Sequence, residues 1–214
     1  MSAKARAGAE LERIDALRGH EKTDPFHLRQ LRDEILRDGH QRDPIVIDGR
    51  TSVILDGHHR AEIFAGLDLK RIAVHRVDYS SPNVSVLSWV PTFDIDPERA
   101  IDMFSRAAVA RASGTGNPGA ALVWKEGMLG LAGDRHGLMG VLVGSVQIHY
   151  AKDESEARDV ISAGKAKAFL VLPPVSKDEV IRSALSGHKL PPKTTRHVFS
   201  SRPASVFVPL RELA

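Results

Sequence analysis

The first regular pattern in the chain is a helical stripe of apolar residues. Asp24 followed by Pro25 is typical of a helix N-cap and first turn, and Gly39 is typical of a helix end. Between them, apolar side chains recur at helical spacing: Leu28, Leu31 and Ile35. The pattern predicts a helix over residues 25–38.

Two short apolar runs follow, at residues 44–47 and 52–55. The segment between them, 48–51, reads Asp-Gly-Arg-Thr, a turn signal that predicts a pair of strands. A helix is predicted next over residues 57–67, and a strand over residues 71–77.

Beyond Val84 the pattern predicts a mixture of strands and helices. Strands are predicted at residues 84–89, 121–124, 141–149, 168–172 and 205–210. Helices are predicted to begin at Asp96-Pro97, at Asp153 and at Ser176, where Glu179 has the spacing of a capping box. The glycine-rich segment 113–119 interrupts the pattern, so we expect an α+β protein of two lobes, 1–112 and 113–214.

Composition narrows the class of protein. The 214 residues are 42% hydrophobic but only 5% aromatic, so the core must consist mainly of aliphatic side chains. Cysteine is absent, which excludes disulfides, thiolate metal sites and thiol nucleophiles. No apolar run approaches the ~20 residues of a membrane span, and no secretory signal is recognisable, so a soluble cytoplasmic protein without a membrane partner is expected. The net charge of +3 suits any anionic ligand and selects none.

The strongest local signal is the segment Asp56-Gly57-His58-His59-Arg60, directly after an apolar strand. A glycine there allows a tight turn, and the free amides of the following helix attract anions. His59 and Arg60 would add donors for phosphate oxygens. Asp56 would repel phosphate, so its expected role is to hold Mg²⁺ or to orient a neighbour. The alternative is an ordinary capped helix with solvated basic residues.

These residues resemble the ParB/sulfiredoxin superfamily, in which this strand-turn-helix forms the nucleotide phosphate site. The resemblance implies cofactor binding by Gly57, His58, His59 and Arg60. Sulfiredoxin activity needs a cysteine, which this chain lacks. Chromosome-partitioning proteins continue with a helix-turn-helix, whereas here Trp89-Val90-Pro91 and several strands follow, so nucleic acid is disfavoured as a partner.

The free L-serine kinase branch of the superfamily accounts for more positions. Residues 17–21 resemble the segment that carries the catalytic glutamate of that branch, here Glu21. Residues 190–197 are similar to its late substrate loop, and Trp89 stands where a substrate-site tryptophan is expected. The resemblance covers roughly residues 10–110 and 188–210. It implies a ParB/sulfiredoxin-like N-terminal lobe, a second mixed α/β lobe and an active site in the cleft between them.

Residue chemistry is compatible with these roles. A serine hydroxyl is a poor nucleophile, and Glu21 offers a carboxylate that can accept its proton. Arg196 can bind the α-carboxylate of an amino acid in bidentate fashion, with Thr195 and His197 as neighbouring donors. The alternatives are a solvated loop glutamate and a basic loop without a ligand.

The resemblance therefore implies a free L-serine kinase that uses ATP or ADP with Mg²⁺ and binds nucleotide and L-serine. Glu21 and Asp56 are its expected catalytic residues, and Asp56 is also the expected contact to Mg²⁺ carried by the nucleotide. Two alternatives remain open at this point: a nucleotide-responsive DNA-binding regulator, and a kinase of another small hydroxylated amino acid.

Overall fold

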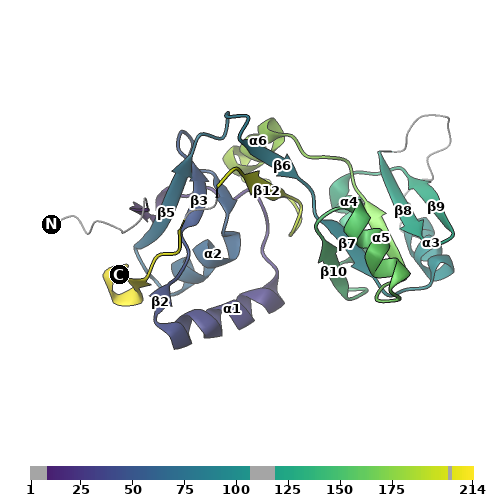
Figure 1. The fold of residues 1–214 in the computed structure, drawn as a ribbon, viewed down its shortest axis with the longest axis horizontal. Coiled ribbons are helices and arrows are strands. Elements are labelled where there is room, and N and C mark those ends of the chain that lie inside the picture. The colour runs from purple at the N-terminus through teal and green to yellow at the C-terminus, as the bar shows by residue number, and fades with distance from the viewer. Residues whose placement is uncertain (1–8, 107–118, 202–203) are drawn as a thin grey trace. The chain divides into compact units, whose positions relative to one another are not determined.

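The structure, a computed structural model, describes residues 9–106, 119–201 and 204–214. Within these residues the chain divides into two compact units (Figure 1). The first consists of the chain up to Val86 together with Ser176–Pro192 and His197–Ala214, and the second of Leu87–Val175 and Lys193–Arg196.

This division differs from the expected boundary near residue 113. The chain enters the second unit after Val86, because Phe93, Ala100 and Phe104 belong to the hydrophobic core of that unit. The segment 113–119, apart from its last residue, lies outside the described residues. The chain also changes from one unit to the other at residues 175/176, 192/193 and 196/197, and none of these changes was expected.

A four-stranded sheet forms the centre of the first unit. Its strands, in spatial order, are β1 (Glu10–Arg13), β5 (Arg71–Val77), β3 (Ile45–Asp48) and β4 (Ile54–Asp56). β3 and β5 are parallel, and the two outer pairs are antiparallel. The predicted pairing of 44–47 with 52–55 is confirmed as β3 and β4, and the strand predicted over 71–77 is β5. β1 was not predicted.

Helices α1 (Pro25–Asp38) and α2 (His58–Gly66) belong to this unit and confirm two predicted helices. The Asp24 carboxylate accepts the amides of Phe26 and His27, and Gly39 ends α1 with φ of 68°. Side chains from α1, α2 and the sheet share one core: Ile35, Ile45, Ile47, Ile54, Phe64, Ile72 and Val74.

The first unit is completed by segments from the end of the chain. Helix α6 (Lys177–Ser186) begins after Ser176, whose hydroxyl accepts the amide of Glu179 at 3.2 Å, as the capping-box spacing predicted. The other short elements are η1 (Ile14–Ala16), β2 (His40–Gln41), β6 (Val84–Leu87), β12 (Arg196–Phe199), β13 (Val208–Pro209) and η2 (Leu210–Glu212). The terminal residues Leu87 of β6 and Arg196 of β12 are already assigned to the second unit. β6 pairs with β12, and β2 with β13. The strand predicted over 205–210 is therefore shorter than expected.

The second unit is built on a five-stranded antiparallel sheet. Its order is β10 (Ile148–Ala151), β7 (Val90–Phe93), β11 (Ala168–Val171), β8 (Ala120–Trp124) and β9 (Gly127–Leu131). Alternate side chains enter different cores: Leu170 packs with residues of α3 (Pro97–Arg106) and α4 (Arg135–Leu142), and Phe169 with residues of α5 (Glu154–Ser162).

One predicted strand in this unit was wrong. Residues 141–149 were expected to form a strand, but residues 141 and 142 end α4, and β10 begins only at Ile148. Leu138, Met139 and Leu142 are buried together in the core, which is a helical spacing. Val141 and Val143 are β-branched, a type of residue that favours strands, and the tertiary packing overrode that local preference. In the part of the chain that the structure describes, no helix combines the length and apolar character that crossing a membrane requires.

Candidate functional site

The turn between β4 and α2 has the geometry that the sequence motif predicted. Gly57 follows β4 with φ of 103°, and α2 begins at the next residue. A Cβ atom at Gly57 would lie 3.0 Å from Arg60 Nη2 and 3.0 Å from Ile45 Cγ1, so only glycine fits without displacing a neighbour. No side chain caps α2, so its first-turn amides have no side-chain acceptor. These amides can therefore bind an anion.

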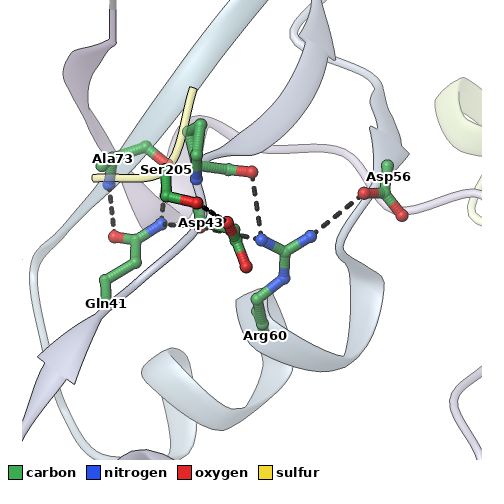
Figure 2. Close-up of polar contacts among 7 residues, drawn as sticks. Gln41, Asp43, Asp56, Arg60, Ala73 and Ser205 are labelled. Atoms are coloured by element: carbon green, nitrogen blue, oxygen red, sulfur yellow. Dashed lines mark hydrogen bonds and ion pairs between the residues drawn. The ribbon is translucent and has the colours of Figure 1, made fainter. Parts of the chain in front are cut away.

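Arg60 stabilises this turn through hydrogen bonds of its guanidinium group (Figure 2). Its Nη1 donates to the carbonyl oxygens of Asp43 at 2.8 Å and Pro44 at 3.0 Å, and its Nη2 donates to Asp56 Oδ2 at 3.1 Å. The Arg60 side chain is 19% exposed, whereas that of Asp56 is 55% exposed. The guanidinium thus connects the start of α2 with the chain before β3 and with the end of β4.

The chain before β3 is itself anchored by a buried amide. Gln41 Nε2 donates to the carbonyls of Ala73 at 2.8 Å and Asp43 at 3.0 Å, while its Oε1 accepts the Ala73 amide at 2.7 Å (Figure 2). Ser205 Oγ donates to Asp43 Oδ1 at 2.9 Å. The oxygen that Arg60 contacts is therefore fixed by β5 and by the C-terminal segment.

The two adjacent histidines of the motif reach different segments. His58 Nε2 accepts the backbone amide of His20 at 3.3 Å, and His59 Nε2 accepts that of Asp24 at 3.0 Å. Burial, followed by the nearby His20 and His197, lowers the pKa of His58 well below its ordinary value. His58 is therefore neutral, and because Nε2 is an acceptor, its proton is on Nδ1, which can donate to a ligand.

His20, which was not among the predicted functional residues, lies at the centre of a histidine cluster. It is fully buried, and its ring meets those of His58 and His197 edge to face, with centroids 4.4 Å and 5.7 Å away. Its position directly before Glu21 was the only sequence signal for it. The cluster brings together His58 and His197, which come from distant parts of the sequence.

His197 makes its polar contact with Tyr79, a second residue without any sequence signal. Its Nε2 lies 2.9 Å from the Tyr79 hydroxyl. Burial, and secondarily His20, lowers the pKa of His197 to about 3, while the Leu55 backbone acts in the opposite direction. Burial raises the pKa of Tyr79 above its ordinary range. The phenol is therefore the donor and the neutral imidazole the acceptor.

Glu21 is held beside this cluster and is 8% exposed. Its Oε1 is 3.7 Å from His20 Nε2. The backbone around it is fixed, because Leu190 donates its amide to the His20 carbonyl at 2.8 Å and accepts that of Lys22 at 2.9 Å. Ser183 of α6 also donates to the His20 carbonyl, at 3.0 Å. A nearly buried carboxylate on a fixed loop is well placed to accept a proton from a bound ligand.

Lys189 adds a cation to this part of the first unit. Its Nζ lies 3.9 Å from the position that a Cβ atom on Gly19 would occupy, and its charge contributes to the lowered pKa of His58. No role was predicted for Lys189 from the sequence. Its charge adds to the attraction that the first turn of α2 has for anions.

The remaining predicted residues, Trp89, Thr195 and Arg196, belong to the second unit. Lys193 Nζ and Arg196 Cζ lie over the Trp89 ring, 5.4 Å and 5.8 Å from its centroid. Thr195, which lies between these two residues in the sequence, is 8% exposed. Arg196 Nε is buried and has no hydrogen-bond partner among the described residues, which suits an arginine that binds an acceptor on a ligand.

A fixed metal centre is not formed by the described residues, among which no group of three or more His, Asp or Glu side chains could hold an ion. Asp56 is an exposed carboxylate with one oxygen on Arg60. Such a residue suits Mg²⁺ that keeps most of its other ligands on a nucleotide and water.

Comparison with known proteins gives relatives along most of the chain, although no protein-family model matches it. A ParB-like protein from Sulfolobus acidocaldarius is 31% identical over 173 residues, 78% of each chain. An ATP-dependent L-serine kinase from Desulfurococcus mucosus is 26% identical over 226 aligned residues, 94% of this chain and 89% of the relative. An ADP-dependent L-serine kinase from Thermococcus kodakarensis is 26% identical over 176 residues, 75% of this chain and 73% of the relative.

A solved structure shares the fold over the full length of the chain. A free serine kinase in complex with AMP superposes with a TM-score of 0.84 and 22% identity, covering 100% of this chain and 99% of the other. The expected fold class, a ParB-like mixed α and β architecture, is thereby confirmed.

Proposed function

Since this chain belongs to the ParB-like protein family, we propose that it is a free L-serine kinase, which transfers a phosphoryl group from ATP or ADP to L-serine. The product is O-phospho-L-serine. The observation that carries the proposal is the similarity, along 94% of the chain, to a protein named as an ATP-dependent L-serine kinase. Nucleotide and free serine are both cytoplasmic metabolites, so the proposal includes a cytoplasmic location.

The nucleotide phosphates bind at the first turn of α2. Uncapped amides after Gly57, the Nδ1 proton of His58 and the charge of Lys189 all favour an anion there. Arg60 and His59 contact protein groups, so their main part is to hold the turn in shape, while Arg60 also contributes its positive charge. Asp56 is the residue that would contact Mg²⁺, which neutralises charge on the phosphates when bound.

Glu21 acts as the general base. The serine oxygen forms a bond to the terminal phosphorus, the bond from that phosphorus to its bridging oxygen breaks, and the hydroxyl proton passes to Glu21. The neighbouring His20 and the backbone contacts of the loop keep the carboxylate in place. Positioning and charge neutralisation supply most of the rate enhancement in such transfers.

The second unit contributes recognition of the amino acid. Arg196 binds the α-carboxylate, with Thr195 as an adjacent donor, and Trp89 fixes the direction of the guanidinium through its ring face. His197 was also expected to bind serine. Its Nε2 accepts from Tyr79, so any direct contact with serine would use the rest of the ring.

The test is serine-dependent nucleotide turnover with a phosphoserine signal in phosphorus NMR. ATP and ADP are compared as donors, and threonine and homoserine are compared with serine as acceptors. Glu21→Gln should abolish turnover and leave nucleotide affinity nearly unchanged, whereas Glu34→Gln on the exposed face of α1 should behave as the parent. Turnover that survives in Glu21→Gln removes the base assignment, and salt-sensitive DNA binding without turnover would favour a DNA-binding regulator instead.

A further inference from the structure

Tyr79 is fixed at both its backbone and its side chain. Its amide donates to Asp48 Oδ1 at 3.3 Å, and its hydroxyl donates to His197 Nε2 at 2.9 Å. Asp48, which is 3% exposed, is itself held, because its Oδ2 accepts the amide and hydroxyl of Thr51 at 3.0 Å and 2.6 Å. The turn after β3 thus sets the position from which the phenol reaches His197.

The ring of Tyr79 is held in the same way. It is 3% exposed, and Lys177 Nζ lies 5.2 Å from its centroid while donating to the Ser81 carbonyl at 2.8 Å. Burial and the charges of Asp48 and Asp178 keep the phenol protonated, so its proton is available to His197 at any physiological pH. A rigid aromatic ring with one directed donor is a positioning element rather than simple core filling.

His197 has few alternatives to this arrangement. The groups that face it are the Tyr79 hydroxyl, the Leu55 backbone, His20 and Lys177, and His58 lies beyond His20. A proton on His197 would place a charge in a buried site near the Lys177 cation, with no carboxylate among these groups to balance it. Its ring stacks on Phe199 with centroids 6.3 Å apart, which restricts rotation further.

We propose that Tyr79 is a positioning residue that acts through His197. Its hydroxyl fixes the tautomer and orientation of His197, and the His197 ring in turn holds His20, the neighbour of Glu21, against His58. Tyr79 does not touch substrate in this arrangement, and its effect reaches the reaction only through the three imidazoles. The kinetic part of this inference rests on the proposed kinase function, whereas the structural part does not.

The structural part is tested by histidine NMR titration of the full chain. The His197 ring signal of the parent is identified by its loss in His197→Gln. Its chemical shift should stay constant from pH 5 to pH 8, because the ring stays neutral. Tyr79→Phe removes the donor that stabilises the neutral ring, so the pKa of His197 should rise and its signal should begin to move on the acid side of this window. Tyr150→Phe, which alters the only other tyrosine, should leave the titration unchanged. An unchanged His197 titration in a folded Tyr79→Phe protein would overturn the proposal.

The kinetic part compares the same two variants. Tyr79→Phe should lower kcat by about tenfold or more and move the acid limb of the pH profile to higher pH, because displaced groups cost rate steeply. The KM for nucleotide should change less than kcat, because the first-turn amides of α2 and the His58 side chain remain present in this variant. A shifted titration with an unchanged kcat profile would refute the link to catalysis. If the parent itself lacks serine-dependent turnover, the kinase proposal fails. The NMR titration still tests whether Tyr79 holds His197 in its neutral form.

Discussion

His20 and His58 meet edge to face, with ring centroids 4.4 Å apart, and the amide of His20 donates to Nε2 of His58 at 3.3 Å. The contact joins two segments that are 38 residues apart in the sequence. One carries Glu21, and the other is the first turn of α2. The proposed base and the proposed phosphate site are therefore held together by direct contact rather than through the hydrophobic core.

Removal of His58 should weaken both parts of this arrangement. His58→Ala deletes the acceptor for the His20 amide and the Nδ1 donor, each worth about 1 kcal/mol or more when buried. We expect ADP affinity, measured by calorimetry with Mg²⁺, to fall about tenfold, and turnover to fall further. His149→Ala, on the exposed face of β10, is the control and should bind as the parent does. Equal affinities for the parent and His58→Ala would contradict a ligand contact at this ring.

Gly57 should tolerate no side chain. Alanine at φ of 103° is strained and would press on Arg60 and Ile45, so Gly57→Ala should cost about 1–3 kcal/mol in urea unfolding and weaken nucleotide binding. Gly66→Ala is the matched control, because no atom lies within 4 Å of its Cβ position and it is the last residue of the same helix. That variant should be neutral or slightly more stable. Similar losses in both variants would argue against a special turn.

Local patterns predicted the elements of the first unit well, because their determinants lie a few residues apart. The Asp24 cap, the Gly39 end of α1 and the strand over 71–77 follow directly from such patterns. The prediction failed at 141–149, where β-branched residues lie at the end of a buried helix. In the site, the turn at Gly57 was predictable, but the Tyr79–His197 contact joins residues 118 positions apart and has no local signal.

Gln41 should be essential to the stability of the first unit. Its side chain satisfies both the amide and the carbonyl of buried Ala73, so Gln41→Ala leaves two backbone groups without partners. We expect a loss of about 2–4 kcal/mol in the free energy of unfolding, measured with urea. Gln30→Ala, on the exposed face of α1, should change it by less than about 0.5 kcal/mol. A small loss at Gln41 would mean that water replaces the amide.

Trp89 should affect serine more than nucleotide. Trp89→Leu removes the ring face over which Lys193 and Arg196 lie, so the guanidinium loses its fixed direction. The KM for serine should rise about tenfold, and the KM for nucleotide should stay near the parent value. Trp124→Leu removes the other tryptophan, in β8, and serves as the control for loss of a ring in the same unit. A rise in both KM values for Trp89→Leu would mean that Trp89 supports the fold rather than serine binding.

The histidine cluster should make the protein sensitive to acid. His197 has an ordinary pKa of 6.5 in the unfolded chain and about 3 when folded, so between these values the unfolded state binds the extra proton. Stability is therefore complete above about pH 6.5 and is lost as the pH falls toward 3. For this single group the loss in the free energy of unfolding between pH 7.5 and pH 5 is about 2 kcal/mol.

Urea unfolding at the two pH values should give a smaller difference in His197→Gln than in the parent. His149→Gln, with an exposed ring in β10, should keep the full difference. An equal pH dependence in all three proteins would mean that His197 is already charged in the folded state, and the neutral form of His197 would have to be abandoned.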